Sequence, residues 1–113
     1  MSRILRTLRQ KRLREVGEVG QARLFAASAQ ITAPGLRGEF AVRYLVGAGI
    51  HALTAPAALH AVATSIDAGV SWQDGPALDL PDAAPDFMVE PAARAAFGGA
   101  LDALGIVREK LGL

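Results

Sequence analysis

The sequence predicts a small α/β domain in which helices surround a sheet of two or three short strands. The chain has 113 residues, a length typical of one domain. Two short mixed stretches, Ala29–Thr32 and Ala52–Ala55, lie next to proline and glycine, as short strands next to turns do. Segments with helical spacing of apolar residues alternate with these stretches. Because the strand signals are thin, an all-helical bundle is the alternative.

The single domain divides into four segments, each with its own composition. They are a basic helical arm (1–28), the core of the α/β unit (29–70), an acidic proline-rich loop (71–90) and a C-terminal amphipathic helix (91–113). In the arm, apolar spacing predicts helices over residues 3–14 and 18–28. Residues 1–14 carry six basic groups and no acid, whereas the rest of the chain carries six basic and eleven acidic groups. Such asymmetry is typical of an arm that binds nucleic acid, a membrane surface or an acidic partner.

In the second segment, Glu39–Val46 is predicted to be helical, with Phe40, Tyr44 and Val46 as candidate buried positions. Pro56 suits the first turn of a further helix that ends near Ile66. Four prolines and five acidic groups between Ser71 and Pro91 predict a long loop.

Pro91 opens the last predicted helix, which runs to Leu111. Its apolar face consists of residues at three- and four-residue steps, namely Phe97, Leu101, Leu104, Val107 and Leu111. The aromatic side chains Trp72 and Phe87 are interpreted as packing anchors of the acidic loop, with a partner contact as the alternative.

Composition excludes several chemistries. The chain has no cysteine, which removes disulfides, thiolate metal sites and a cysteine nucleophile, and it favours a reducing compartment such as the cytoplasm. His51 and His60 could meet as metal ligands, but no third ligand has suitable spacing, so no metal site is expected. The apolar stretch 42–70 contains charged residues, which argues against a membrane span.

Four pieces of the sequence resemble the opening of a known enzyme family. Arg6–Gln10 reads RTLRQ, and Glu15–Gln21 reads EVGEVGQ. Ala33–Gly38 forms a turn, APGLRG, and Tyr44–Thr54 reads YLVGAGIHALT. Together, without a gap from Arg6 to Thr54, these pieces resemble the ThiF, MoeB and HesA family, the bacterial relatives of ubiquitin-activating enzymes.

The resemblance implies a reduced Rossmann-like fold and the vestige of a nucleotide site. Family members bind ATP and magnesium and adenylate the C-terminal glycine of a ubiquitin-like sulfur-carrier protein. In this sequence the resemblance assigns the nucleotide site to Gly35 and Gly38 in the turn and to Arg9 in the arm, where it matches an arginine that reaches a neighbouring subunit's nucleotide.

Several family positions are altered here. Ala33 and Leu36 replace two glycines of the turn, and Pro34 has no N–H to donate. The acids expected after the second strand are replaced by Ala57 and Leu59. We therefore expect neither catalytic residues nor a cofactor.

The first functional hypothesis is a non-catalytic interaction or structural subunit, acting as a homodimer or in a larger complex, with a ubiquitin-like protein as one conceivable partner. The second is an adenylyltransferase fragment that uses ATP and magnesium when another chain completes it. The third is nucleic-acid binding by the basic arm, which is disfavoured because no aromatic residues are interleaved with the basic ones.

Overall fold

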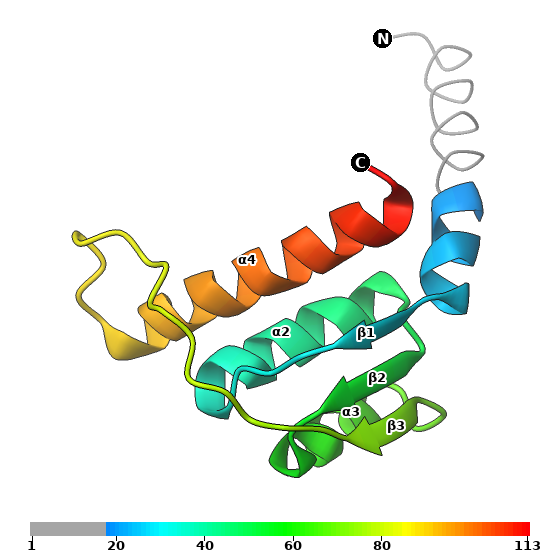
Figure 1. The fold of residues 1–113 in the computed structure, drawn as a ribbon, viewed down its shortest axis with the longest axis horizontal. Coiled ribbons are helices and arrows are strands. Elements are labelled where there is room, and N and C mark those ends of the chain that lie inside the picture. Colours follow the sequence, from blue (N-terminus) through cyan, green and yellow to red (C-terminus); the bar gives the residue numbers. More distant parts are fainter. Residues whose placement is uncertain (1–17) are drawn as a thin grey trace, which may run out of the picture.

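The computed structural model describes residues 18–113, which form a mixed α/β domain (Figure 1). After a helix that ends at residue 26, the chain follows a β-α-β-α-β path. Its elements are β1 (Ser28–Gln30), α2 (Gly35–Ala48), β2 (Ala52–Ala55), a short 3-10 helix η1 (Ala57–Leu59), α3 (His60–Ile66) and β3 (Ser71–Asp74), and α4 (Pro91–Leu111) follows. The α/β prediction is confirmed, and the all-helical alternative is wrong.

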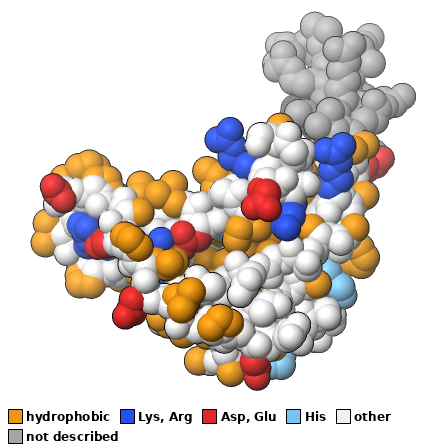
Figure 2. All heavy atoms as spheres, in the orientation of Figure 1, with side chains coloured by type: hydrophobic (Ala, Val, Ile, Leu, Met, Phe, Trp, Pro, Cys, Tyr) orange, Lys and Arg blue, Asp and Glu red, His pale blue; other side chains and the backbone are white. Residues whose placement is uncertain are grey.

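The three strands form one parallel sheet in the order β1-β2-β3. Ala29, Leu53 and Trp72 share one face in register, and this face packs against α2 and α3, which contact one another. The opposite face carries small and polar side chains, including Gln30 and Gln73 on either side of Thr54. This region is mostly white in Figure 2. Parallel sheets are usually covered on both faces, so the exposed face is unusual.

Helix α2 begins four residues earlier than predicted. Pro34 has an extended backbone and precedes the helix, and Gly35 takes up a positive φ of 65° in its first turn. At the other end Gly49 is left-handed, with a φ of 107°, and the amides of Gly49 and Ile50 donate to the carbonyls of Val46 and Leu45. Two such hydrogen bonds are typical of a helix that ends at a left-handed glycine.

The core is built mainly from α2 and small side chains. Val42, Leu45 and Ile50 are its largest fully buried side chains, and burial of each contributes about 1.5–3 kcal/mol. Val46 is buried as predicted, but Tyr44 is 52% exposed, so its predicted burial is wrong.

β2 has the predicted bounds, and η1 with α3 fills the predicted helix after Pro56. β3 was not predicted: residues 71–74 were assigned to the acidic loop, but they pair with β2, so the loop begins at residue 75. Its sequence, Ser-Trp-Gln-Asp, is mostly polar because it forms an edge strand with three exposed residues. The first strand also begins one residue earlier and ends two residues earlier than predicted.

Helix α4 has the predicted bounds. Pro91 occupies the first turn, the Glu90 side chain accepts the amide of Ala92, and Gly112 ends the helix with a φ of 77°. The side chains of α4 that pack on α2 are small ones, Gly98, Gly99 and Ala103, and they lie outside the predicted apolar face. Leu101 and Leu104 point away from that interface and are 43% and 53% exposed. No helix in residues 18–113 is sufficiently long and apolar to span a membrane.

Candidate functional site

In open parallel sheets, ligands bind outside the carboxyl ends of the strands, where helix N-termini point. In this protein that edge holds the N-terminus of α2 and the turn that contains Gly35. Open space surrounds Gly35, because a Cβ built there would meet no atom within 4 Å. Its positive φ nevertheless favours glycine, since a side chain there costs about 1 kcal/mol or more.

Gly38 has a packing role that is clear from its surroundings. A Cβ at this position would lie 1.9 Å from the carbonyl oxygen of Ala33 and 2.8 Å from Cδ1 of Leu59. The missing side chain therefore lets α2 approach the end of β1 closely. The last glycine of the dinucleotide-binding turn has the same role in helix–strand packing. The third residue assigned by the resemblance, Arg9, lies outside the described residues.

Arg37, in the first turn of α2, joins three segments of the chain. Its Nε and Nη2 donate to the two carboxylate oxygens of Asp102 on α4, at 2.8 and 2.9 Å. Its Nη1 donates to the carbonyl oxygen of Pro81, at 2.9 Å. The side chains of this ion pair are only 19% and 22% exposed. The hydrogen bond to Asp102 raises the pKa of Arg37 against the opposing effect of burial, so the guanidinium stays charged.

The segment after β3 crosses the carboxyl edge of the sheet. The amide of Gly75 donates to the carbonyl of Ala55 at the end of β2, and the amide of Leu78 donates to that of Thr32 beyond β1, both at 2.8 Å. The segment continues to Leu80 and Pro81 beside α2. Part of the edge where a ligand would enter is therefore covered by the chain itself.

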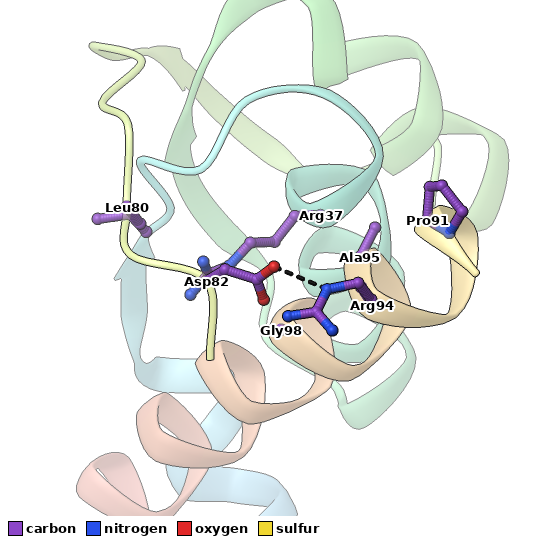
Figure 3. Close-up of a pocket in the computed structure, with 7 residues that line it drawn as sticks. All are labelled: Arg37, Leu80, Asp82, Pro91, Arg94, Ala95 and Gly98. Carbon is purple, nitrogen blue, oxygen red and sulfur yellow. Dashed lines mark hydrogen bonds and ion pairs between the residues drawn. The ribbon is translucent and has the colours of Figure 1, made fainter. Parts of the chain in front are cut away.

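Two pockets lie on either side of Leu80, between this segment and α4. The larger, of about 340 Å³, is lined by Arg37, Leu80, Asp82, Pro91, Arg94, Ala95 and Gly98 (Figure 3). The smaller, of about 210 Å³, lies next to β1 and is lined by Gln30, Ile31, Thr32, Ala33, Leu80, Asp102 and Ile106. Each pocket therefore contains a carboxylate.

Arg94 fixes the loop that borders the larger pocket. Its Nε donates to Oδ2 of Asp82 at 2.8 Å, and its other nitrogens donate to the carbonyls of Ala84, Pro85 and Met88. Figure 3 shows the guanidinium reaching from α4 to this carboxylate. The hydrogen bond from Arg94, followed by that from the amide of Ala84, lowers the pKa of Asp82 against the opposing effect of burial.

The arrangement is poorly suited to a triphosphate. Both guanidinium groups of the larger pocket already have oxygen partners within the protein. Asp82 and Asp102 add negative charge, which would repel phosphate oxygens at these distances. A nucleotide would have to break these ion pairs before its phosphates could bind either guanidinium group.

The two histidines that could have met as metal ligands have different neighbours in the structure. His51 stacks on Phe25 and lies 3.3 Å from Asp67, whereas His60 stacks on Trp72. Among residues 18–113 no three side chains of metal-binding type form a cluster.

The two predicted aromatic anchors of the loop differ. Trp72 packs against the core and donates from Nε1 to Asp74, so its packing role is confirmed, although it lies in β3 rather than in the loop. Phe87 is 81% exposed, which contradicts its role as a packing anchor.

Sequence reasoning missed both ion pairs of this edge. Arg37 and Asp102 are 65 residues apart, and the turn motif that contains Arg37 does not indicate its partner. The proline-rich spacing between Asp82 and Arg94 gives no signal either, because the pairing depends on how the loop folds back on α4.

In comparisons with known proteins, no family model, no curated protein and no solved structure matches this chain. The resemblance to the adenylating family therefore has no support beyond the four sequence motifs. The proposed function is inferred from the fold and from the geometry of the carboxyl edge.

Proposed function

We propose that the chain is a non-catalytic interaction or structural protein, whose β-α-β-α-β unit derives from the adenylating family. The observation that carries this proposal is the covered carboxyl edge of the sheet. The chain's own segment 75–81 crosses that edge. The carbonyl oxygen of Pro81 in this segment and the carboxylate of Asp102 on α4 accept hydrogen bonds from Arg37, which follows the turn.

The topology and one glycine support the family relationship. The strand order β1-β2-β3 with intervening helices is that of a mononucleotide-binding half of the Rossmann fold. Gly38 retains the packing position expected of the last glycine in the turn. The positions that would bind phosphate or ribose carry proline or apolar side chains. Pro34 has no N–H to donate, and Leu59 is buried.

Exposed surfaces of the sheet support an interaction role. β1 and β3 are edge strands of a narrow sheet, and edge strands present unpaired backbone groups that invite association. One face of the sheet is polar and is left uncovered by residues 18–113, with Gln30 and Gln73 exposed. A protein of this size also buries a modest fraction of its surface and gains stability from a partner.

Isothermal titration calorimetry of the whole chain with ATP and Mg²⁺ tests the proposal. We expect no binding in the micromolar range, because a nucleotide would have to displace the Arg37–Asp102 pair. The double variant Asp82→Asn, Asp102→Asn is the matched comparison, since it removes both carboxylates and keeps their size. Micromolar affinity of the unmodified chain would contradict the proposal and favour the adenylyltransferase hypothesis.

A further inference from the structure

The segment between β3 and α4 has few apolar contacts with the domain. Within residues 76–89, all of which the structure describes, only Ala84 is buried, and no side chain belongs to the hydrophobic core. Leu78 and Leu80, in the part next to the sheet, are 51% and 39% exposed. Segments with few buried apolar contacts are the ones that open locally in native proteins. This segment, called the strap, is therefore held in place mainly by hydrogen bonds.

One arginine outside the strap binds four of its residues. Arg94 lies one helical turn before Gly98, which is buried where α4 packs against α2. Its guanidinium group donates to the carboxylate of Asp82 and to the backbone carbonyl oxygens of Ala84, Pro85 and Met88. Figure 3 shows Arg94 reaching from the helix to Asp82. Because hydrogen bonds from a charged donor are roughly twice as strong as neutral ones, this side chain is the main attachment of residues 82–88.

The part of the strap next to the sheet has fewer attachments. The amide of Leu78 donates to the carbonyl oxygen of Thr32 at 2.8 Å. The carbonyl oxygen of Pro81 accepts from Nη1 of Arg37 at 2.9 Å. If the strap moved away, Arg37 would keep both of its bonds to Asp102. The contact between α2 and α4 would therefore survive the opening of the strap.

Both ends of the strap are fixed to regular structure. The amide of Gly75 donates to the carbonyl oxygen of Ala55, and a Cβ at Gly75 would lie 2.8 Å from Cγ2 of Thr54. At the other end, Glu90 caps α4 by accepting an amide of its first turn. In Figure 1 the strap is the yellow loop that runs from β3 past the N-terminal end of α2 to the start of α4. The sheet and the helices can therefore stay in place while the strap moves.

We propose that residues 76–89 form a strap that opens as one unit over the carboxyl edge of the sheet, and that Arg94 is its latch. Opening frees the carbonyl oxygen of Thr32 and removes Leu80 from both pockets, which then form one groove beside Arg37. The closed strap is an autoinhibitory cover, because a partner that binds at this edge has to release the latch first. This inference goes beyond the proposed function, since it concerns the chain without any ligand.

Native-state hydrogen exchange of the whole chain, followed by NMR, tests the inference. The amides of Leu78 and Ile31 are a matched pair, because each donates to a carbonyl oxygen at 2.8 Å, Leu78 from the strap and Ile31 from the end of β1 to Thr54. The protection of Leu78, relative to its intrinsic exchange rate, should be at least about tenfold lower than that of Ile31. It should also stay constant in low urea, because opening of the strap exposes little surface. Equal protection of the two amides, or a fall at Leu78 as steep as that of global unfolding, would overturn the inference.

Arg94→Met removes the latch and keeps an unbranched side chain. It should lower the protection of Leu78 at least about tenfold, although the hydrogen bonds of Arg94 reach only residues 82–88, because the strap opens as one unit. Arg43→Met is the matched control, since the ion pair of Arg43 with Glu39 lies on α2, and it should change the protection of Leu78 less than about twofold.

Unchanged protection of Leu78 in Arg94→Met would also overturn the inference. If this variant does not fold, the comparison of Leu78 with Ile31 in the natural chain still decides. Exchange is measured without nucleotide, so failure of the latch and failure of the proposed function are separately visible.

Discussion

Replacement of Gly99 by alanine tests the close contact between α4 and α2. A Cβ at this position would lie 2.5 Å from the carbonyl oxygen of Arg37, 2.7 Å from Cβ of Phe40 and 2.9 Å from the amide nitrogen of Ala41. Since two of these atoms belong to the backbone of α2, no side chain can rotate away. To reach ordinary contact distances of about 3.5 Å, α4 would have to shift by roughly 1 Å.

Two opposing effects determine how much Gly99→Ala changes the free energy of unfolding. Overpacking of this kind costs about 1–3 kcal/mol, and backbone atoms place it near the upper end. Alanine gains about 1 kcal/mol over glycine in a helix interior. We therefore expect Gly99→Ala to lower the free energy of unfolding by about 1–2 kcal/mol.

Gly105→Ala is the matched control in the same helix. A Cβ there would meet no atom within 4 Å, so only the helix propensity changes. The control should raise the free energy of unfolding by about 0.5–1 kcal/mol. Urea denaturation followed by circular dichroism measures both, and thermal midpoints of the two variants should differ by roughly 10 °C. If Gly99→Ala were as stable as Gly105→Ala, the proposed close packing of α4 on α2 would be refuted.

Three further variants probe the carboxyl edge. Arg37→Met leaves the half-buried carboxylate of Asp102 without its partner and should cost about 1–3 kcal/mol by urea denaturation, and an unchanged midpoint would contradict a stabilising ion pair. Because the pKa of Asp82 is below its ordinary value, its ion pair is complete above about pH 4 and is lost as the pH falls through the lower folded pKa. The protection of the loop amides, measured relative to their intrinsic exchange rate at the same pH, should therefore fall below pH 4 in the natural chain, whereas Asp82→Asn should show low protection already at neutral pH; high protection in the variant would count against the pairing. Gly35→Ala should cost about 1 kcal/mol for its positive φ, while Gly47→Ala, at an open position of α2, should stabilise the chain; equal stability of the two would argue against the left-handed turn.

Local signals in the sequence were sufficient to predict the bounds of α4 and of one strand. Pro91 marks the start of α4 because proline suits a first turn. β2 was predicted because turn residues lie on both sides of a short apolar stretch. β3 was missed because an exposed edge strand lacks the apolar pattern that identifies a buried one.

The orientation of α4 could not be predicted, because apolar spacing identifies a face without naming what covers it. Apolar residues at helical steps indicated one face, but close packing on α2 required small residues on the other. The candidate site was predicted only in part. The turn residues Gly35 and Gly38 were found by motif, whereas the Arg37–Asp102 pair depends on the tertiary fold and leaves no local signal.

We propose that the carboxyl edge of the sheet, which the chain's own loop covers in part, binds no nucleotide. A nitrogen-15 correlation spectrum of the labelled chain, recorded with and without millimolar ATP and Mg²⁺, tests this residue by residue. If no nucleotide binds, the amide signals of Gly35, Leu36, Arg37 and Gly38 should keep their positions. Saturable shifts concentrated at these four amides would contradict it.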